Sequence, residues 1–206
     1  MADGLFGEWP TLEPDGAPPS PDAERRVLFV CTGNIARSAA AERIARARHA
    51  GIGLEYDSAG IGALVGRPVA DDVEAAVRAR GADPGPHVAK QVTRALVDGA
   101  GLILVADVEH RDWLLEEWPD LVHRVALLRE AAAVAAALAD DPDGAAGSEP
   151  GRLPAARRLV DRCGHSRRWG IADPYRRGPV RGERAVAEVE QALAVLLPLY
   201  AASVRR

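Results

Sequence analysis

Short apolar runs alternate along the chain with stretches whose apolar residues recur at helical spacing. The unbroken runs at 27–30 and 102–105 predict strands that are covered on both faces, and weaker patterns at 54–58 and 125–128 predict two more strands. Stretches of helical spacing, including one long apolar stripe near the C-terminus, separate or follow these runs. This alternation is typical of an α/β fold, so we expect a three-layer domain with a four-stranded parallel sheet and helices on both faces.

Two segments depart from this alternation. Residues 1–24 contain five prolines among acidic and small residues, a composition that predicts a disordered tail, so we expect the domain to occupy residues 25–206. Residues 131–170 combine an Ala-rich helical stretch with an acidic stretch rich in Gly and Pro. We interpret the block from about 131 to 170 as an insertion, to which the sequence assigns no role.

Composition narrows the class of protein. The net charge of -4 over 206 residues argues against nucleic acid as a partner. The start lacks the basic-then-apolar order of a signal peptide, and no apolar run is expected to span a bilayer, so we expect no membrane partner. Two cysteines make no disulfide framework, which predicts a cytoplasmic, reducing location. The local runs of arginine are interpreted as solvated surface.

A loop after the first strand carries the candidate chemistry. Cys31 ends this strand, at the edge where parallel sheets bind ligands. Five residues separate it from Arg37, and Gly33 and Asn34 tolerate positive φ, so the backbone N–H groups can point inward. Such a nest, with the next helix N-terminus, binds a tetrahedral anion and favours thiolate. Arg37 offers a planar fork to phosphate, and Ser38 a hydroxyl to the sulfur. The expected phosphate-binding residues are Thr32, Gly33, Asn34, Ile35, Ala36 and Ser38.

The loop has other interpretations when it is taken alone. A cysteine at the end of a buried strand is often only a small apolar residue. Phosphatase chemistry also needs a general acid, and Asp173 is the candidate because Pro174 keeps it extended and stiffens its loop. Tyr175 would form an aromatic wall for a substrate ring. An Asp-Pro pair by itself usually marks only a turn.

Several motifs together resemble a known family. VLFVCTGNIARS, at residues 27–38, resembles the N-terminal signature of low-molecular-weight protein tyrosine phosphatases. Further landmarks match in the same order over roughly residues 27–200, apart from the insertion: Asp57-Ser58-Ala59-Gly60, His87 to Val92, the Asp107 turn and Asp173-Pro174-Tyr175. The resemblance implies the flavodoxin-like phosphotyrosine phosphatase I fold and a hydrolase without cofactor or metal. Its substrate would be a phosphotyrosine protein or a small aryl phosphate.

The resemblance also implies residue roles. Cys31 would be the nucleophile, which forms a phosphocysteine intermediate, Arg37 the phosphate binder, and Asp173 the acid and then the base. A hydrogen-bond network that braces the loop would comprise Asn34, Ser38, Ser58 and His87. The remaining histidines receive no role, and Asp107 is first of all a helix cap; these histidines are His49, His110, His123 and His165.

Departures from the family pattern leave two alternatives open. Ala36 stands where many relatives carry a second cysteine, and residues 63–66 resemble a bacterial, particularly actinobacterial, version of their loop. An arsenate reductase of the same fold would need further thiols, and only Cys163 is available, inside the expected insertion. A non-catalytic phosphate-binding protein would be expected to lack the nucleophile or the acid. The sequence predicts neither the physiological substrate nor the oligomeric state.

Overall fold

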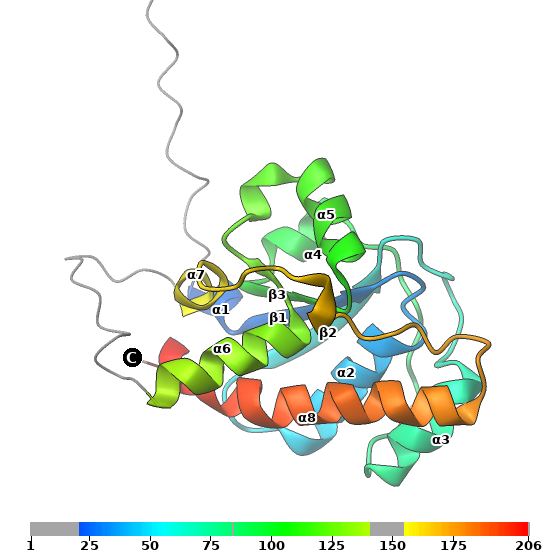
Figure 1. Cartoon of the computed structure of the whole chain (residues 1–206). Helices are drawn as coiled ribbons and strands as arrows, with labels where there is room; N and C mark the ends of the chain where they lie inside the picture. The colour runs from blue at the N-terminus through cyan, green and yellow to red at the C-terminus, as the bar shows by residue number, and fades with distance from the viewer. Residues whose placement is uncertain (1–20, 84, 141–154, 206) are drawn as a thin grey trace, which may run out of the picture.

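The computed structural model describes residues 21–83, 85–140 and 155–205. Within them, four parallel strands form one sheet in the order β2-β1-β3-β4 (Figure 1). The strand bounds are β1 Arg26–Cys31, β2 Glu55–Gly60, β3 Leu102–Val105 and β4 Val125–Leu127. From β1 the chain passes to β2 on one side of β1, and it then returns to β3 on the other side. The carboxyl end of β1 is therefore a topological switch point.

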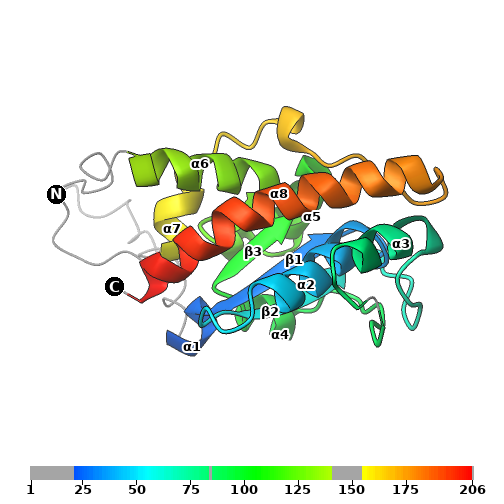
Figure 2. The same cartoon turned by 90° about the horizontal axis from the view of Figure 1, so that it is seen from below.

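Helices cover both faces of the sheet (Figures 1 and 2). One face carries α2 Arg37–Arg48, α3 Asp71–Ala79, α6 Leu128–Asp140, α7 Ala155–Val160 and α8 Pro179–Val204. The other carries α4 Arg94–Asp98, α5 Val108–Glu117 and the 3-10 turn η1 Pro119–Leu121. A second 3-10 turn, η2 Arg167–Trp169, precedes the Asp173 loop. The predicted three-layer α/β fold is confirmed.

Each strand of the sheet contributes to two cores. In β1, Phe29 packs into the cluster under α2 and α8, whereas Leu28 packs into the cluster under α4 and α5. In β3, Leu104 packs into the cluster under α2 and α8, and Ile103 packs into the cluster under α4 and α5. Successive strand residues point to opposite faces, and here both faces are covered by helices. This explains why these strands are unbroken apolar runs in the sequence.

The expected insertion is only partly separate from the domain. Its first ten residues belong to α6, whose Ala131, Ala132 and Ala135 are buried against the core and whose main partner helix is α8. Small alanine side chains allow this close packing of two helices, so this part of the block is a helix of the domain core, and its origin as an insertion stays a prediction. Farther on, α7 also packs into the same core. The Gly/Pro-rich stretch at 141–154 lies outside the described residues.

Both ends of the domain also need a correction. Most of the expected disordered tail, residues 1–20, lies outside the described residues, but Pro21–Glu24 form the short helix α1. This turn is held because Ala23 O accepts from Gly101 N at 2.7 Å and Glu24 O accepts from the Tyr200 hydroxyl at 3.0 Å. At the other end, α8 is long and apolar enough to cross a membrane, which was not expected, yet half of its apolar stretch is buried inside the protein.

Candidate active site

The Cys31 loop lies at the switch point of the sheet. Cys31 is the last residue of β1, and Arg37 is the first residue of α2, so the five residues between them turn the chain at the carboxyl edge of the strands. Both side chains are buried, with only 2% of Cys31 and 6% of Arg37 exposed. The strand–loop–helix junction predicted from the sequence is therefore present.

The carbonyl groups of this loop all point to protein donors. The carbonyls of Cys31 and Thr32 accept from the N–H groups of Ile61 and Gly62, each at 3.0 Å. Those of residues 33–36 accept from Leu64 N, His87 Nε2, Ala70 N and Ala40 N. Among the described residues, by contrast, no acceptor takes a hydrogen bond from the N–H groups of residues 33–37. A curled loop with its carbonyls engaged outward and five N–H groups unused is an anion-binding nest.

Two residues make the tight curl possible. Asn34 adopts φ of 54°, in the left-handed region that Asn tolerates better than most residues. Gly33, the other residue expected to take positive φ, does not do so. Gly60, at the end of β2, is required by space, because a Cβ there would lie 2.4 Å from Thr32 O and 3.0 Å from Asn34 N. The loop thus packs directly against the neighbouring strand.

On the β2 side, a directed chain of hydrogen bonds holds the loop. Lys90 N donates to Asn34 Oδ1 at 2.9 Å, which fixes the orientation of the amide. Asn34 Nδ2 then donates to Ser58 Oγ at 2.8 Å and to Ser38 Oγ at 3.1 Å. The hydroxyl proton of Ser38 is left for Cys31 Sγ at 3.0 Å, with Ala59 O farther away at 3.4 Å. The predicted brace residues do meet around Asn34.

A carboxylate that sequence reasoning missed ends this chain. Glu42 Oε2 accepts from Ser58 Oγ at 2.6 Å and lies 3.7 Å from His87 Nδ1. Burial opposes its charge, but the hydrogen bonds from His87 and Ser58 and the charge of Arg46 outweigh burial and hold the pKa of Glu42 below its usual value. Glu42 follows Ser38 by four residues on α2, so the two share a helix face. That spacing was the available signal.

Arg37 divides its donors between the protein and the nest. Nη1 donates to Ile171 O at 3.1 Å, and Nη2 lies 3.3 Å from Asp173 Oδ1. Nη2 also lies 3.5 Å from Thr32 Oγ1. Within the described residues, the buried Nε has no hydrogen-bond partner. A buried guanidinium N–H without a protein acceptor suits a bound anion, because phosphate can accept from two adjacent nitrogens of the fork.

The loop that carries Asp173 is anchored just before that residue. Ile171 N donates to Ala106 O at 2.8 Å, and Gly170 O accepts from Arg129 Nη1 at 3.2 Å. Gly170 lies close to its neighbours here, since a Cβ would lie 2.8 Å from Asp107 Oδ2 and 3.2 Å from Arg167 O. The Asp173 side chain itself is 46% exposed. The structure therefore brings the predicted acid to the same guanidinium as the loop, 136 residues away along the chain from Arg37.

His110 is the second residue that the sequence analysis missed. Its Nδ1 accepts from Asp107 N at 2.9 Å, as in a capping box with His at the third helical position. Burial, and then the charge of Arg37, lower the pKa of His110 to about 4, so the ring is neutral with its proton on Nε2. Nε2–H must then donate to Thr32 Oγ1, which lies 3.0 Å away. The hydroxyl proton of Thr32 is left free to donate elsewhere.

Comparison with known proteins identifies the family. The profile of the low molecular weight phosphotyrosine protein phosphatases matches residues 26–164. The chain belongs to this family. The family, the fold and the enzyme class, a phosphoric monoester hydrolase, were therefore predicted correctly.

Relatives of this phosphatase cover most of its domain. A protein from Ralstonia nicotianae described as "probable low molecular weight protein-tyrosine-phosphatase EpsP" is 30% identical over 174 residues, 84% of this chain and 94% of the relative. A protein-arginine-phosphatase from Geobacillus stearothermophilus is 28% identical over 105 residues, 51% of this chain and 70% of the relative. Among solved structures, the tyrosine phosphatase amsI from Erwinia amylovora matches with a TM-score of 0.63 and 22% identity, over 84% of this chain and 91% of that one.

Other sequence predictions for the phosphatase have mixed outcomes. Tyr175 follows the acid closely, with its N–H 3.4 Å from Asp173 Oδ1, but its role as a substrate wall stays a prediction. Cys163 was expected in a flexible insertion; instead it packs against the core, and its Sγ lies 3.6 Å from Leu159 O. Burial, and then Glu130, raise the pKa of Cys163 to about 12. Among the described residues, no group of three or more His, Cys, Asp or Glu side chains could hold a metal ion.

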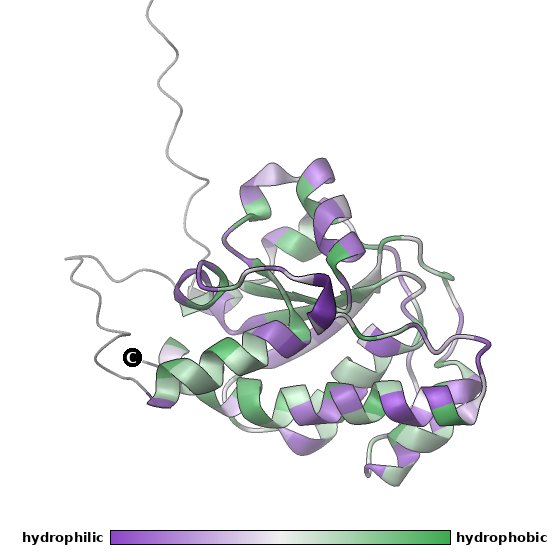
Figure 3. Ribbon diagram, in the orientation of Figure 1, coloured by the Kyte–Doolittle hydropathy of each residue, from purple (hydrophilic) through white to green (hydrophobic). Residues whose placement is uncertain are grey.

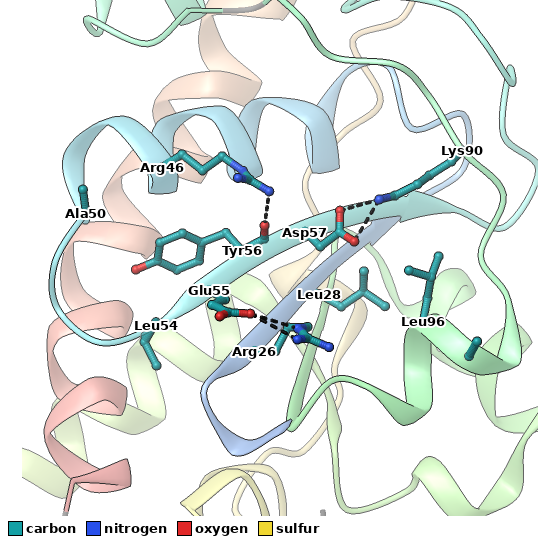
Figure 4. Close-up of a pocket in the computed structure, with 11 residues that line it drawn as sticks. Arg26, Leu28, Arg46, Ala50, Leu54, Glu55, Tyr56, Asp57, Lys90 and Leu96 are labelled. Carbon is teal, nitrogen blue, oxygen red and sulfur yellow. Dashed lines mark hydrogen bonds and ion pairs between the residues drawn. The ribbon is translucent and has the colours of Figure 1, made fainter. Parts of the chain in front are cut away.

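A separate hollow of about 640 Å³ lies beside the edge strand β2 (Figure 4). Its charged side chains are already paired: Arg26 with Glu55 at 3.2 Å and Lys90 with Asp57 at 2.6 Å. Arg46 Nη2 donates to the backbone carbonyl of β2 at residue 56. Paired charges along an edge strand block further strand addition. None of the residues that line this hollow belongs to the Cys31 loop.

Proposed function

We propose that the protein hydrolyses phosphotyrosine in proteins through a phosphocysteine intermediate. The observation that carries the proposal is the nest itself. Five N–H groups without protein acceptors and the unpartnered Arg37 Nε surround the position where Cys31 ends its strand. A phosphoryl group bound there would place its three equatorial oxygens on these donors and its phosphorus in line with the sulfur.

In the first step, the Cys31 thiolate attacks phosphorus and the bond to the phenolic oxygen breaks. Asp173, held 3.3 Å from Arg37, gives its proton to that oxygen, so tyrosine leaves as a neutral phenol. The phosphoryl group is then bonded to sulfur. The Ser38 hydroxyl, 3.0 Å from the sulfur, stabilises its negative charge before attack and again when the sulfur leaves.

In the second step, Asp173 takes a proton from water as the water oxygen attacks phosphorus, and the phosphorus–sulfur bond breaks. Inorganic phosphate and the thiolate result, so the enzyme returns to its starting form. Thr32 adds a donor to both steps. The Thr32 hydroxyl oxygen accepts a hydrogen bond from His110 Nε2. The hydroxyl proton of Thr32 is therefore available to donate to a phosphate oxygen.

The two alternatives receive less support. Arsenate reduction needs a resolving thiol, but Cys163 is half-buried and its raised pKa keeps it protonated at neutral pH. A non-catalytic phosphate binder has no use for an acid beside Arg37, where Asp173 lies. We propose a cytoplasmic bacterial enzyme, because its two free cysteines suit a reducing compartment and its relatives come from bacteria. That neither nucleic acid nor membrane is a partner stays a prediction, supported by the net charge of -4.

The test compares matched peptides that carry phosphotyrosine, phosphoserine or phosphoarginine, with p-nitrophenyl phosphate as a small aryl phosphate. We expect the phosphotyrosine peptide to be hydrolysed fastest, and Cys31→Ser to lower turnover by a factor on the order of 10⁵. Rapid acid quench followed by mass spectrometry of the Cys31 peptide should detect the phosphoryl adduct. Arsenate-dependent oxidation of a small thiol, without aryl phosphate hydrolysis, would assign the reductase instead.

A further inference from the structure

The segment around the proposed acid is strongly basic. Residues 167–184 contain six arginines and only two acidic residues, Asp173 and Glu183, a net charge of +4 in a chain whose total is -4. Figure 3 shows hydrophilic residues at both ends of the stretch from η2 to α8, which frames the Asp173 loop. In the sequence alone, such runs are typical of ordinary solvated surface. Their place in the fold changes that interpretation.

Most of this positive charge has no carboxylate partner among the described residues. Arg184 pairs with Glu188 at 3.1 Å. Arg167 lies 3.6 Å from Glu109, but both side chains are about three-quarters exposed, and such pairs contribute little. Four exposed arginines form no ion pair with any described residue: Arg168, Arg176, Arg177 and Arg181. A cluster of unpaired charge beside a cleft attracts anions.

Two of these arginines are held in place near the acid. The Arg176 guanidinium lies 5.1 Å from the centre of the Tyr175 ring, a cation–π geometry. Arg177 N donates to Pro174 O at 3.0 Å, which closes the turn that follows Asp173. Arg177 is four residues from Asp173, so its Cα can lie at most about 14 Å from that of the acid. This is the reach of a few peptide residues on either side of a bound phosphotyrosine.

The loop that follows β2 carries an arginine of the same kind. Leu64 N donates to Gly33 O and Arg67 N donates to Leu64 O, each at 3.0 Å, so this loop is joined directly to the nest. Leu64 and Val65 are 40% and 68% exposed, and they offer apolar surface to an aromatic ring. Arg67 forms no ion pair with any described residue. The two segments, one bonded to the nest and the other to Arg37, thus combine an apolar or aromatic surface with cations that form no ion pair.

We propose that this rim, defined as Arg67, Arg176 and Arg177, binds anionic side chains that flank the hydrolysed phosphotyrosine. The inference rests on the proposed function and names its substrate class: a peptide segment with carboxylates, or a second phosphorylated residue, within about four residues of the target. Carboxylate and phosphate share the chemistry that a guanidinium fork recognises. A peptide fits better than a long polyanion, because the rest of the chain carries a net charge of -8, the total of -4 less the +4 of residues 167–184.

The experiment measures kcat/KM for three phosphotyrosine peptides of equal length. Their flanks are neutral, carry aspartate and glutamate, or carry a second phosphotyrosine. We expect the two anionic peptides to exceed the neutral one by about tenfold in 20 mM salt, and the advantage to shrink in 500 mM salt, where charges are screened beyond a few ångströms. The comparison of the two anionic peptides shows whether carboxylate or phosphate is the better ligand.

Two of the three rim arginines are then replaced together, with Arg176→Asn and Arg177→Gln. Asn is chosen at the first position because Arg176 has φ of 56°, which Asn tolerates. The matched control, Arg25→Gln with Arg205→Gln, removes the same charge from two exposed positions beside the N-terminal end of β1 and the C-terminal end of α8. We expect the rim variant to lose the preference for anionic flanks about fivefold or more, and the control to keep it.

Hydrolysis of p-nitrophenyl phosphate separates this inference from the proposed function, because that ester has no flanking residues. Absent p-nitrophenyl phosphate turnover in the unmodified enzyme would overturn the proposed function. Normal turnover with equal kcat/KM for all three peptides would overturn the rim alone. An equal loss of preference in the control variant would also overturn the rim, since total charge would then be the cause.

Discussion

The Cys31 loop is held from two sides that differ in burial. On the β2 side, Asn34 and Ser58 are fully buried, and their hydrogen bonds run without a break from Glu42 to the sulfur. On the α5 side, the contacts converge on Arg37 and end at Asp173, whose side chain is nearly half exposed. The first side consists mainly of buried amides and hydroxyls around Glu42, which pairs with Arg46 at 2.8 Å, whereas the second side joins a buried guanidinium to a half-exposed carboxylate.

This difference indicates a division of work. Buried, fully satisfied networks fix geometry, and their loss costs folding free energy. A carboxylate at the cleft mouth can meet water and a leaving group, but it adds little to stability. We therefore expect substitution of Asp173 to change chemistry without changing stability, and substitutions on the β2 side to change both.

The largest effect is expected on the exposed side. Asp173→Asn should lower kcat/KM for a phosphotyrosine peptide about 10³-fold, because the phenolic oxygen would leave without a proton. The loss should be smaller with p-nitrophenyl phosphate, whose leaving group needs less protonation. The free energy of unfolding, measured by urea denaturation, should change by less than about 1 kcal/mol. Equal losses with both esters would contradict the role of general acid.

On the buried side, Ser58→Ala should affect both properties. It leaves one Asn34 N–H without an acceptor and removes one hydrogen bond from the Glu42 carboxylate, so we expect a loss of about 2 kcal/mol in unfolding free energy. Turnover should fall about tenfold, because Asn34 would hold the loop less firmly. Urea denaturation and steady-state kinetics on one preparation measure the two effects. A fall in turnover without any change in stability would break the comparison between the two sides.

The two sides also differ in how far sequence predicted them. The four strands, the loop and the meeting of Cys31, Arg37 and Asp173 could be predicted, because unbroken apolar runs and ordered motifs carry that information. Glu42 and His110 were missed, since each looks like an ordinary helix residue until the fold places it. An Asp-x-x-His spacing after the third strand was visible, but which hydroxyl His110 would meet depends on packing between α5 and the loop. The role of α6 as a core helix was equally invisible, because alanine is common both in buried and in solvated helices and does not by itself mark a core face.

A double-mutant cycle measures the link between His110 and the loop. Thr32→Val removes the hydroxyl with little change of shape, and we expect kcat/KM to fall about fivefold, the value of one hydrogen bond to phosphate. His110→Phe should cost less, because it only frees that hydroxyl to rotate. In the Thr32→Val background, His110→Phe should have no further effect on kcat/KM. Additive losses would show that His110 does not act through Thr32.

His110 should also contribute to the pH dependence of the free energy of unfolding. Its replacement should have little effect on turnover at neutral pH. Its pKa in the folded protein is about 4, lowered mainly by burial and then by Arg37, whereas its ordinary value is 6.5. Between pH 4 and 6.5 the unfolded chain therefore binds this proton more readily than the folded protein does. The free energy of unfolding is highest above pH 6.5 and decreases by up to about 3 kcal/mol as the pH falls towards 4. Glu42 contributes only below its ordinary value of 4.5, because its pKa is lowered in the fold. Urea denaturation between pH 4.5 and 6.5 should thus show that the free energy of unfolding depends less on pH in His110→Phe than in the unmodified protein. The same pH dependence in both proteins would mean that the His110 ring is not held neutral beside Arg37.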